Sequence, residues 1–231
     1  MLIILAKRDD EGAGWLAERW RDRDAVVVSA GNLSQSGWAH YVGAPQFSTL
    51  RIGGQELREN EIEGVLVRIA SIGTEDLPHI VEADRLYIAA EMTAFLRAWL
   101  SGLPCPVLNR PTAQNLGGPA FRHEQWVQFA IRHGIPAVPV RRDTRAKGAS
   151  VDQDSGCEIR VIGDACFGDG GTTLKERARL LARNSGADLL SVRFTGTNAE
   201  SKFLTASPWP ELGTPETADA ILSWLEERAA C

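Results

Sequence analysis

The first 28 residues contain two short runs of consecutive apolar residues, at 2–6 and 25–28. Between the runs, four apolar residues follow the spacing of one helix face: Ala13, Leu16, Ala17 and Trp20. Asp9 or Asp10 precedes this helix as a capping residue. Continuous apolar runs are typical of strands buried on both faces. The segment therefore predicts a strand–helix–strand unit of a parallel sheet.

The same alternation continues to about residue 120. We expect a hairpin over residues 48–57 around Gly53-Gly54, a strand over 65–68, a long helix over about 77–100 and a short strand at 107–108. Five residues of the long helix share one face: Ile80, Ala83, Tyr87, Ala90 and Ala94. Short strands that alternate with helices predict a small α/β domain with a parallel sheet over residues 1–120.

The second half of the chain has a different pattern. A helix over 121–133 and a strand over 137–140 form a connection at residues 121–140. Residues 141–157 lack apolar periodicity and are interpreted as a linker. A hairpin over 158–167, a helix over 173–185, strands near 189–194 and 202–206 and a final helix after Thr214-Pro215 follow. Residues 158–231 thus predict an α+β domain.

Composition excludes several classes of protein. The 231 residues carry a net charge of −5, with 30 acidic and 25 basic side chains. Such a chain has no general attraction to nucleic acid. The apolar N-terminal run is too short for a signal peptide or a membrane span, so we expect a cytoplasmic protein. The four cysteines lack the spacing of a zinc site.

Five short motifs carry a family resemblance: VLVR at 65–68, PVLNRP at 106–111, RHEQWVQFAIRHGIPAVP at 122–139, EIRVIGD at 158–164 and FLTASP at 203–208. Their order resembles the ATP-grasp family. The resemblance is to the branch of peptide-modifying carboxylate–amine ligases that includes ribosomal-protein glutamate ligases and microviridin-type macrocyclases. It implies an N-terminal domain that precedes an ATP-grasp-like C-terminal domain.

The sequence departs from that family at its ATP and metal positions. The family's lysine, acidic residue, glutamate and asparagine fall at His123, Arg193, Thr205 and Ser207. Phosphates require fixed cations, and Mg²⁺ prefers anionic oxygen ligands. We therefore expect that neither ATP nor Mg²⁺ binds, and that the chain has no metal site.

The family also inserts a lid subdomain where this chain has only residues 141–157, which are 17 residues. A compact subdomain needs about 40 or more residues. The resemblance therefore implies a truncated C-terminal domain without a lid. The chain has four lysines in all, and Lys147 is the only one in this segment.

Other residues are candidates for ligand binding. Arg68, Asn109 and Arg110 follow strands of the first domain, where open sheets bind ligands, although surface ion pairing is an equal alternative. Arg160 belongs to the EIRVIGD motif. The Gly-rich segment 168–173 either binds an anion or forms a turn capped by Thr172 or Thr173. His40 lines a pocket or packs in an aromatic loop. Glu91 is a buried carboxylate or a helix-surface residue.

These departures favour a non-catalytic protein over an enzyme. The resemblance implies a scaffold in peptide or natural-product modification, whose partner is a substrate peptide or a biosynthetic enzyme. One alternative is an active ligase subunit completed by a second chain, or an enzyme that uses the fold for other chemistry. Another is a homodimer in which a second copy covers the apolar surface that the missing lid exposes.

Overall fold

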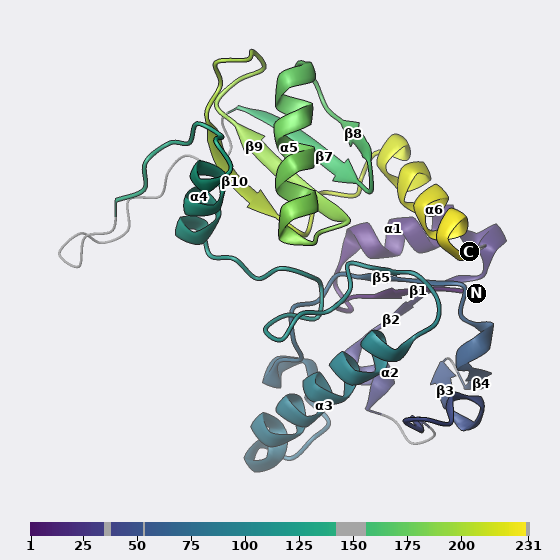
Figure 1. The fold of residues 1–231 in the computed structure, drawn as a ribbon. Coiled ribbons are helices and arrows are strands. Elements are labelled where there is room, and N and C mark those ends of the chain that lie inside the picture. Colours follow the sequence, from purple (N-terminus) through teal and green to yellow (C-terminus); the bar gives the residue numbers. More distant parts are fainter. Residues whose placement is uncertain (35–37, 53, 142–155, 230–231) are drawn as a thin grey trace. The chain divides into compact units, whose positions relative to one another are not determined.

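The computed structural model describes residues 1–34, 38–52, 54–141 and 156–229 (Figure 1). The chain divides into two compact units. One comprises residues 1–118 and the C-terminal segment from Glu211, and the other comprises Pro119–Pro210. Most of the predicted linker, including Lys147, lies outside the described residues.

A parallel sheet forms the centre of the first unit, as predicted. It contains β1 (Leu2–Leu5), β2 (Ala25–Val28), β5 (Gly64–Val67) and β6 (Val107–Leu108), in the order β2-β1-β5-β6. All pairs between neighbouring strands are parallel. Every residue of β1 and β5 is buried, which explains why both strands are continuous apolar runs.

Helices cover both faces of this sheet (Figure 1). α1 (Glu11–Arg19) and α6 (Pro215–Ala229) lie over one face, and α2 (Ala30–Leu33) and α3 (Glu82–Gly102) lie over the other. Asp10 caps α1, since its Oδ1 accepts a hydrogen bond from the Ala13 amide at 2.9 Å. The first unit is therefore a three-layer α/β structure.

The long helix differs from the prediction in its start and in its buried face. Leu77 precedes Pro78, which disfavours helical geometry, so α3 begins at Glu82 instead of near residue 77. Tyr87, on the face identified from the sequence, is 66% exposed. The buried residues of α3 are Ala89, Leu96, Trp99 and Leu100. The core therefore lies against a different face of this helix, which is apolar around much of its circumference.

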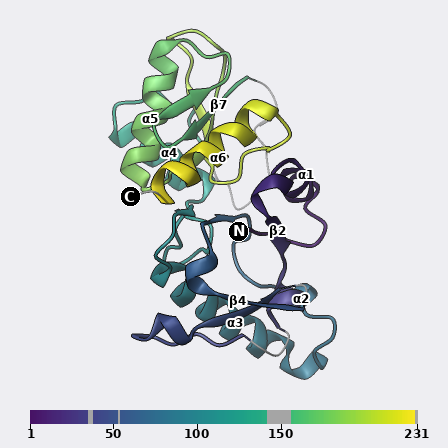
Figure 2. The ribbon, with the colours of Figure 1, turned by 90° about the vertical axis from the view of Figure 1, so that its right-hand side faces the viewer.

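The predicted hairpin also belongs to the first unit. β3 (Thr49–Ile52) and β4 (Gln55–Arg58) pair antiparallel, while Gly53 of the expected turn lies outside the described residues (Figure 2). Leu50 of β3 is fully buried in the same core cluster as Trp99 of α3. The hairpin therefore extends the hydrophobic core beyond the parallel sheet.

The final helix packs with the first unit, although the sequence interpretation grouped residues 158–231 as one domain. A Cβ atom on Gly64 of β5 would lie 3.1 Å from Leu225 of α6, so the missing side chain permits close contact. Two ion pairs join α6 to the first 23 residues, Arg19–Asp219 and Arg23–Glu226. An amphipathic helix can pack on any apolar surface, which explains why its pattern did not reveal its location.

The second unit contains an antiparallel sheet with helices against one face. Its strands are β7 (Cys157–Ile162), β8 (Ala165–Phe167), β9 (Leu189–Phe194) and β10 (Phe203–Ser207), in the order β10-β9-β7-β8. α4 (His123–Arg132) and α5 (Thr172–Ser185) both contribute to the core beneath this sheet, and α5 lies along β7 (Figures 1 and 2). The predicted α+β arrangement is confirmed for residues 119–210, but its two helices are α4 and α5, because the final helix that the prediction placed in this domain belongs to the first unit.

Two local predictions for this unit are wrong. Residues 137–140 form no strand, but only an isolated bridge between Ala137 and Phe203. Pro136 and Pro139 have no amide hydrogen, so a ladder of hydrogen bonds cannot continue there. Gly171, and neither Thr172 nor Thr173, is the capping residue of α5.

No helix within the described ranges is both long enough and apolar enough to cross a membrane.

Candidate functional site

Six polar residues form two rows across the sheet of the second unit. In the first row, Arg193 of β9 lies opposite Glu158 of β7 and Thr205 of β10. In the second row, Ser191 lies opposite Arg160 and Ser207. Paired residues of antiparallel strands project from the same face, so all six side chains share one face of the sheet. We call the surface formed by these six residues the polar face.

The alternation of β7 and β9 explains why the polar face forms. Residues between the polar ones, such as Ile159, Val161 and Val192, point to the opposite face and are fully buried against α4 and α5. In β10 the register shifts between Phe203 and Thr205. This irregularity allows Phe203 to enter the core while Thr205 still joins the polar face.

The polar face carries two guanidinium groups and one carboxylate. The Ser191 hydroxyl donates a short hydrogen bond to Glu158 Oε1, and Ser191 is only 6% exposed. Arg160 and Arg193 are partly buried and both have interaction partners. The formal charge of the six residues is therefore about +1. Such a surface favours carboxylate groups and hydrogen-bonding backbone over metal cations.

The donor set of the polar face contrasts with that of a magnesium site. Mg²⁺ takes carboxylate oxygens and phosphate oxygens in near-octahedral geometry. Glu158 is the only carboxylate among the six residues. Its partner on the neighbouring strand is Arg193, which carries a positive charge. Within the described ranges, no cluster of three His, Cys, Asp or Glu side chains is arranged to hold a metal ion.

The predicted ATP and metal positions are only partly brought together. Arg193, Thr205 and Ser207 share the polar face, and so does Arg160. His123 instead begins α4, whose buried residues belong to the core on the other face. The assignment of ligand-binding roles to these residues stays a prediction.

Arg68 follows β5 at the carboxyl edge of the parallel sheet, as the sequence indicated. Its Nε donates a hydrogen bond to Asp10 Oδ2 at 2.7 Å, and the two side chains are only 14% and 16% exposed. Asp10 thus uses one carboxylate oxygen to cap α1 and the other to bind Arg68. Arg68 therefore has a structural role that links β5 to the start of α1.

Asn109 and Arg110 also lie at this edge and contact protein groups. Asn109 is 1% exposed and its amide donates to Gly117 O at 3.4 Å. The Arg110 guanidinium donates to Leu100 O and Cys105 O at 3.4 and 3.3 Å. Leu100 lies in the last turn of α3, so Arg110 satisfies a carbonyl at the end of that helix.

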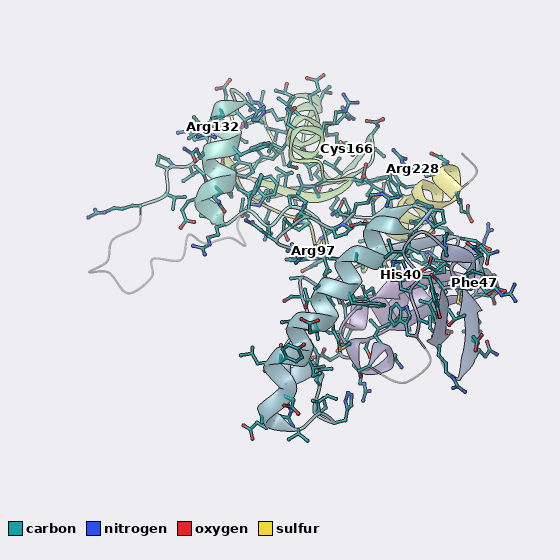
Figure 3. The ribbon with its side chains drawn as sticks, turned by 60° about the horizontal axis from the view of Figure 1, so that its bottom comes forward. His40, Phe47, Arg97, Arg132, Cys166 and Arg228 are labelled. Atoms are coloured by element: carbon teal, nitrogen blue, oxygen red, sulfur yellow. The ribbon has the colours of Figure 1, made fainter. Side chains whose placement is uncertain are left out.

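A partly buried histidine–carboxylate pair lies in the first unit. His40, labelled in Figure 3, places its Nδ1 2.8 Å from Glu59 Oε1. The His40 ring packs edge-on against Phe95 of α3. Ser48 Oγ is 3.5 Å from the same ring nitrogen. A catalytic triad needs its serine and its carboxylate on different ring nitrogens, so this cluster does not form one. Glu91, the carboxylate considered from the sequence, is exposed.

The fold has counterparts among solved structures. The macrocyclase MdnC from Microcystis aeruginosa MRC, bound with the precursor peptide MdnA, matches with a TM-score of 0.69 at 13% identity. That match covers 97% of this chain and 99% of MdnC. The ATP-grasp ligase PsnB, complexed with the precursor peptide PsnA2 and AMPPNP, matches with a TM-score of 0.64 at 12% identity, over 97% of this chain and 98% of PsnB.

A RimK domain ATP-grasp protein from Sphaerobacter thermophilus DSM 20745 matches with a TM-score of 0.52 at 14% identity, over 96% of this chain and 99% of that protein. No family model and no curated protein matches the sequence. The chain therefore has an ATP-grasp-like fold of the kind found in peptide-modifying ligases. At these identities the likeness establishes the fold alone.

Sequence reasoning missed Glu158 and Ser191 as members of the polar face. The signal that could have found them is the alternation of polar and apolar residues in β7 and β9. Alternation alone identifies residues of one strand, however, and only the register shows that Glu158 lies opposite Arg193.

Proposed function

We propose that this protein is a non-catalytic ATP-grasp-like protein that binds a peptide, or a partner enzyme, in peptide modification. The observation that carries the proposal is the position of Arg193 in the polar face, between Glu158 and Thr205. The electrostatic repulsion between a guanidinium at this position and a divalent cation beside it is several kcal/mol at an effective dielectric of about 20. We infer that Mg²⁺ and ATP do not bind to the polar face.

The chemistry of the polar face suits a peptide. Arg160 and Arg193 offer planar pairs of N–H groups that match carboxylates. The hydroxyl groups of Thr205 and Ser207, which are both partly buried, can exchange hydrogen bonds with the backbone of a peptide. MdnC and PsnB were both solved with precursor peptides bound, which supports a peptide as the partner class here.

Calorimetry with Mg²⁺ and ATP tests the proposal. We expect no saturable heat with millimolar nucleotide. A triple variant, Arg193→Asp, Thr205→Glu and Ser207→Asn, restores the oxygen ligands that the family resemblance implies. This variant should bind Mn²⁺, measured by electron paramagnetic resonance, because three oxygen donors then share one face.

The matched control is Arg132→Asp. It makes the same change of charge as Arg193→Asp, at an exposed residue of α4 (Figure 3), and should not create a metal site. Micromolar binding of Mg²⁺–ATP by the unmodified protein would overturn the proposal. ADP release in the presence of a second ligase subunit would instead support the alternative of an active enzyme completed by another chain.

A peptide experiment tests the binding role. A fluorescein-labelled peptide of alternating Glu and Gly residues should bind more tightly than its Gln–Gly counterpart, by about tenfold for each charge-assisted contact. Arg160→Gln should weaken only the binding of the acidic peptide. Equal affinities for the two peptides would contradict the role given to the arginines. Light scattering of the same samples shows whether a second copy of the chain is the partner.

A further inference from the structure

The first unit contains a cavity of about 430 Å³ at the carboxyl edge of its parallel sheet. The residues that line it belong to the loops after β1, β2 and β5. The strand order β2-β1-β5-β6 places β2 on one side of β1 and β5 on the other. The chain therefore leaves β1 toward β2 on one side and later continues through β5 on the other side, which opens a crevice between the loops. Open α/β sheets bind ligands in such a crevice, where the strand order reverses.

The lining of the cavity divides into an apolar part and a charged rim. The apolar part consists of Ala6, Ala30, Ile69, Ile72 and Pro78. The rim carries the charged side chains Lys7, Arg8, Asp9, Glu75 and Asp76 and the imidazole of His79. A volume of this size, with apolar side chains in its lining and polar groups that can orient a ligand, lies in the range of small-molecule sites.

The charges of the rim restrict the ligand. Two cations and three carboxylates face the cavity, so a ligand that carries only phosphate charge is repelled. A molecule with both an ammonium and a carboxylate group matches both kinds of rim side chain. Its remaining atoms must be aliphatic to suit Ile69 and Ile72.

An exposed ion pair lies at the rim of the cavity. Lys7 Nζ lies 3.2 Å from Glu75 Oε1, and the two side chains are 49% and 66% exposed. The hydrogen bond to Glu75 and the nearby Asp76 carboxylate raise the pKa of Lys7, which keeps it charged. Exposed pairs of this kind are weak, so a ligand carboxylate can replace Glu75 at Lys7 while its ammonium replaces Lys7 at Glu75.

The loop that carries Glu75 is held in place by other contacts. His79 Nε2 lies 2.8 Å from Ser34 Oγ, next to α2. The Gly73 amide donates to Asp76 Oδ2 at 2.8 Å, and the Ile72 amide donates to Thr93 Oγ1 of α3 at 3.0 Å. The rim is therefore ordered before a ligand binds, which reduces the entropy cost of binding.

We propose that this cavity binds a small aliphatic zwitterion, namely an α-amino acid or a dipeptide. The ligand carboxylate lies at Lys7 and Arg8, and its ammonium group lies at Asp9 and Glu75. The site uses residues of the first unit only. It is independent of the function proposed for the polar face.

Titration with leucine and with the dipeptide Ala-Leu, by calorimetry and by NMR of amide resonances, tests this site. We expect saturable binding and shifts confined to the loops after β1, β2 and β5. N-acetyl-Ala-Leu-amide has the same shape without charges and should not bind. ATP should not bind to the cavity because its phosphates meet three carboxylates.

Lys7→Met and Asp9→Asn should each weaken binding by about tenfold, the effect of one charge-assisted contact. Both side chains are exposed, so the fold should persist, and thermal unfolding checks this. Lys202→Met, at an exposed lysine of the second unit, is the matched control and should leave binding unchanged. Absence of binding by both probes, equal binding of the uncharged peptide, or unchanged affinity in both rim variants would overturn the proposal.

Discussion

Replacement of Arg68 should destabilise the first unit by removing the contact between β5 and α1. Arg68→Met keeps much of the aliphatic volume and removes the charge. Arg68 Nε lies 2.7 Å from Asp10 Oδ2, in a pair that is only 14% and 16% exposed. Arg68→Met therefore leaves a partly buried carboxylate without its cation.

The magnitude follows from the geometry of the pair. Two charges about 4 Å apart attract by about 4 kcal/mol at an effective dielectric of about 20. Ordering the arginine side chain costs about 2 kcal/mol. The net loss is therefore about 2 kcal/mol. Asp10→Asn should cost a similar amount, because asparagine also caps helices, whereas Asp10→Ala should lose about 1 kcal/mol more.

Hydrogen exchange of the α1 amides, measured by mass spectrometry, gives a local readout. A loss of about 2 kcal/mol corresponds to exchange that is roughly 30 times faster. The double variant Arg68→Met with Asp10→Asn should be little worse than either single variant, because both remove the same contact. Strictly additive effects, or unchanged exchange in Arg68→Met, would refute the structural role of Arg68 and favour a direct ligand-binding role.

Two further predictions concern other parts of the fold. Gly168 has φ of +121°, and a Cβ atom there would overlap Glu158 O, so Gly168→Ala should destabilise the second unit by about 3 kcal/mol or more in urea denaturation. Gly14→Ala, in the middle of α1 with open space around it, is the matched control and should stabilise by up to about 1 kcal/mol. Burial raises the pKa of the Cys105 thiol from 9.0 to about 11. The unfolded chain therefore loses this proton first, and stability should fall as the pH rises between these values. Urea midpoints at about pH 8 and about pH 11 should show a decline that Cys105→Ala reduces; an equal decline in that variant would contradict this cause.

The sequence was sufficient for elements whose signal is local. Consecutive apolar residues at 2–6 and 25–28 indicate strands, although in the edge strand β2 only Val28 is buried. The pair Asp9-Asp10 indicates a helix cap, and the structure identifies Asp10 as the capping residue. The hairpin of β7 and β8 was likewise predictable, because a two-residue turn sets its register. The individual strands and most helices therefore follow from patterns within about 15 residues.

The candidate sites required more than local patterns. Arg193, Thr205 and Ser207 were identified through a family resemblance, but Glu158 and Ser191 join them only through the pairing of three strands. The cavity of the first unit is formed by loops after β1, β2 and β5, which are far apart in the sequence. No spacing rule connects such residues.

The sequence by itself determined the alternation of strands and helices, the class of each half of the chain and the scarcity of lysine. Tertiary structure alone decided that α6 packs on the first unit, that Arg68 binds Asp10 and that six polar residues share one face. The physical reason is that helix and strand formation depends on neighbouring residues, whereas packing and strand register depend on surfaces that exist only after the chain has folded.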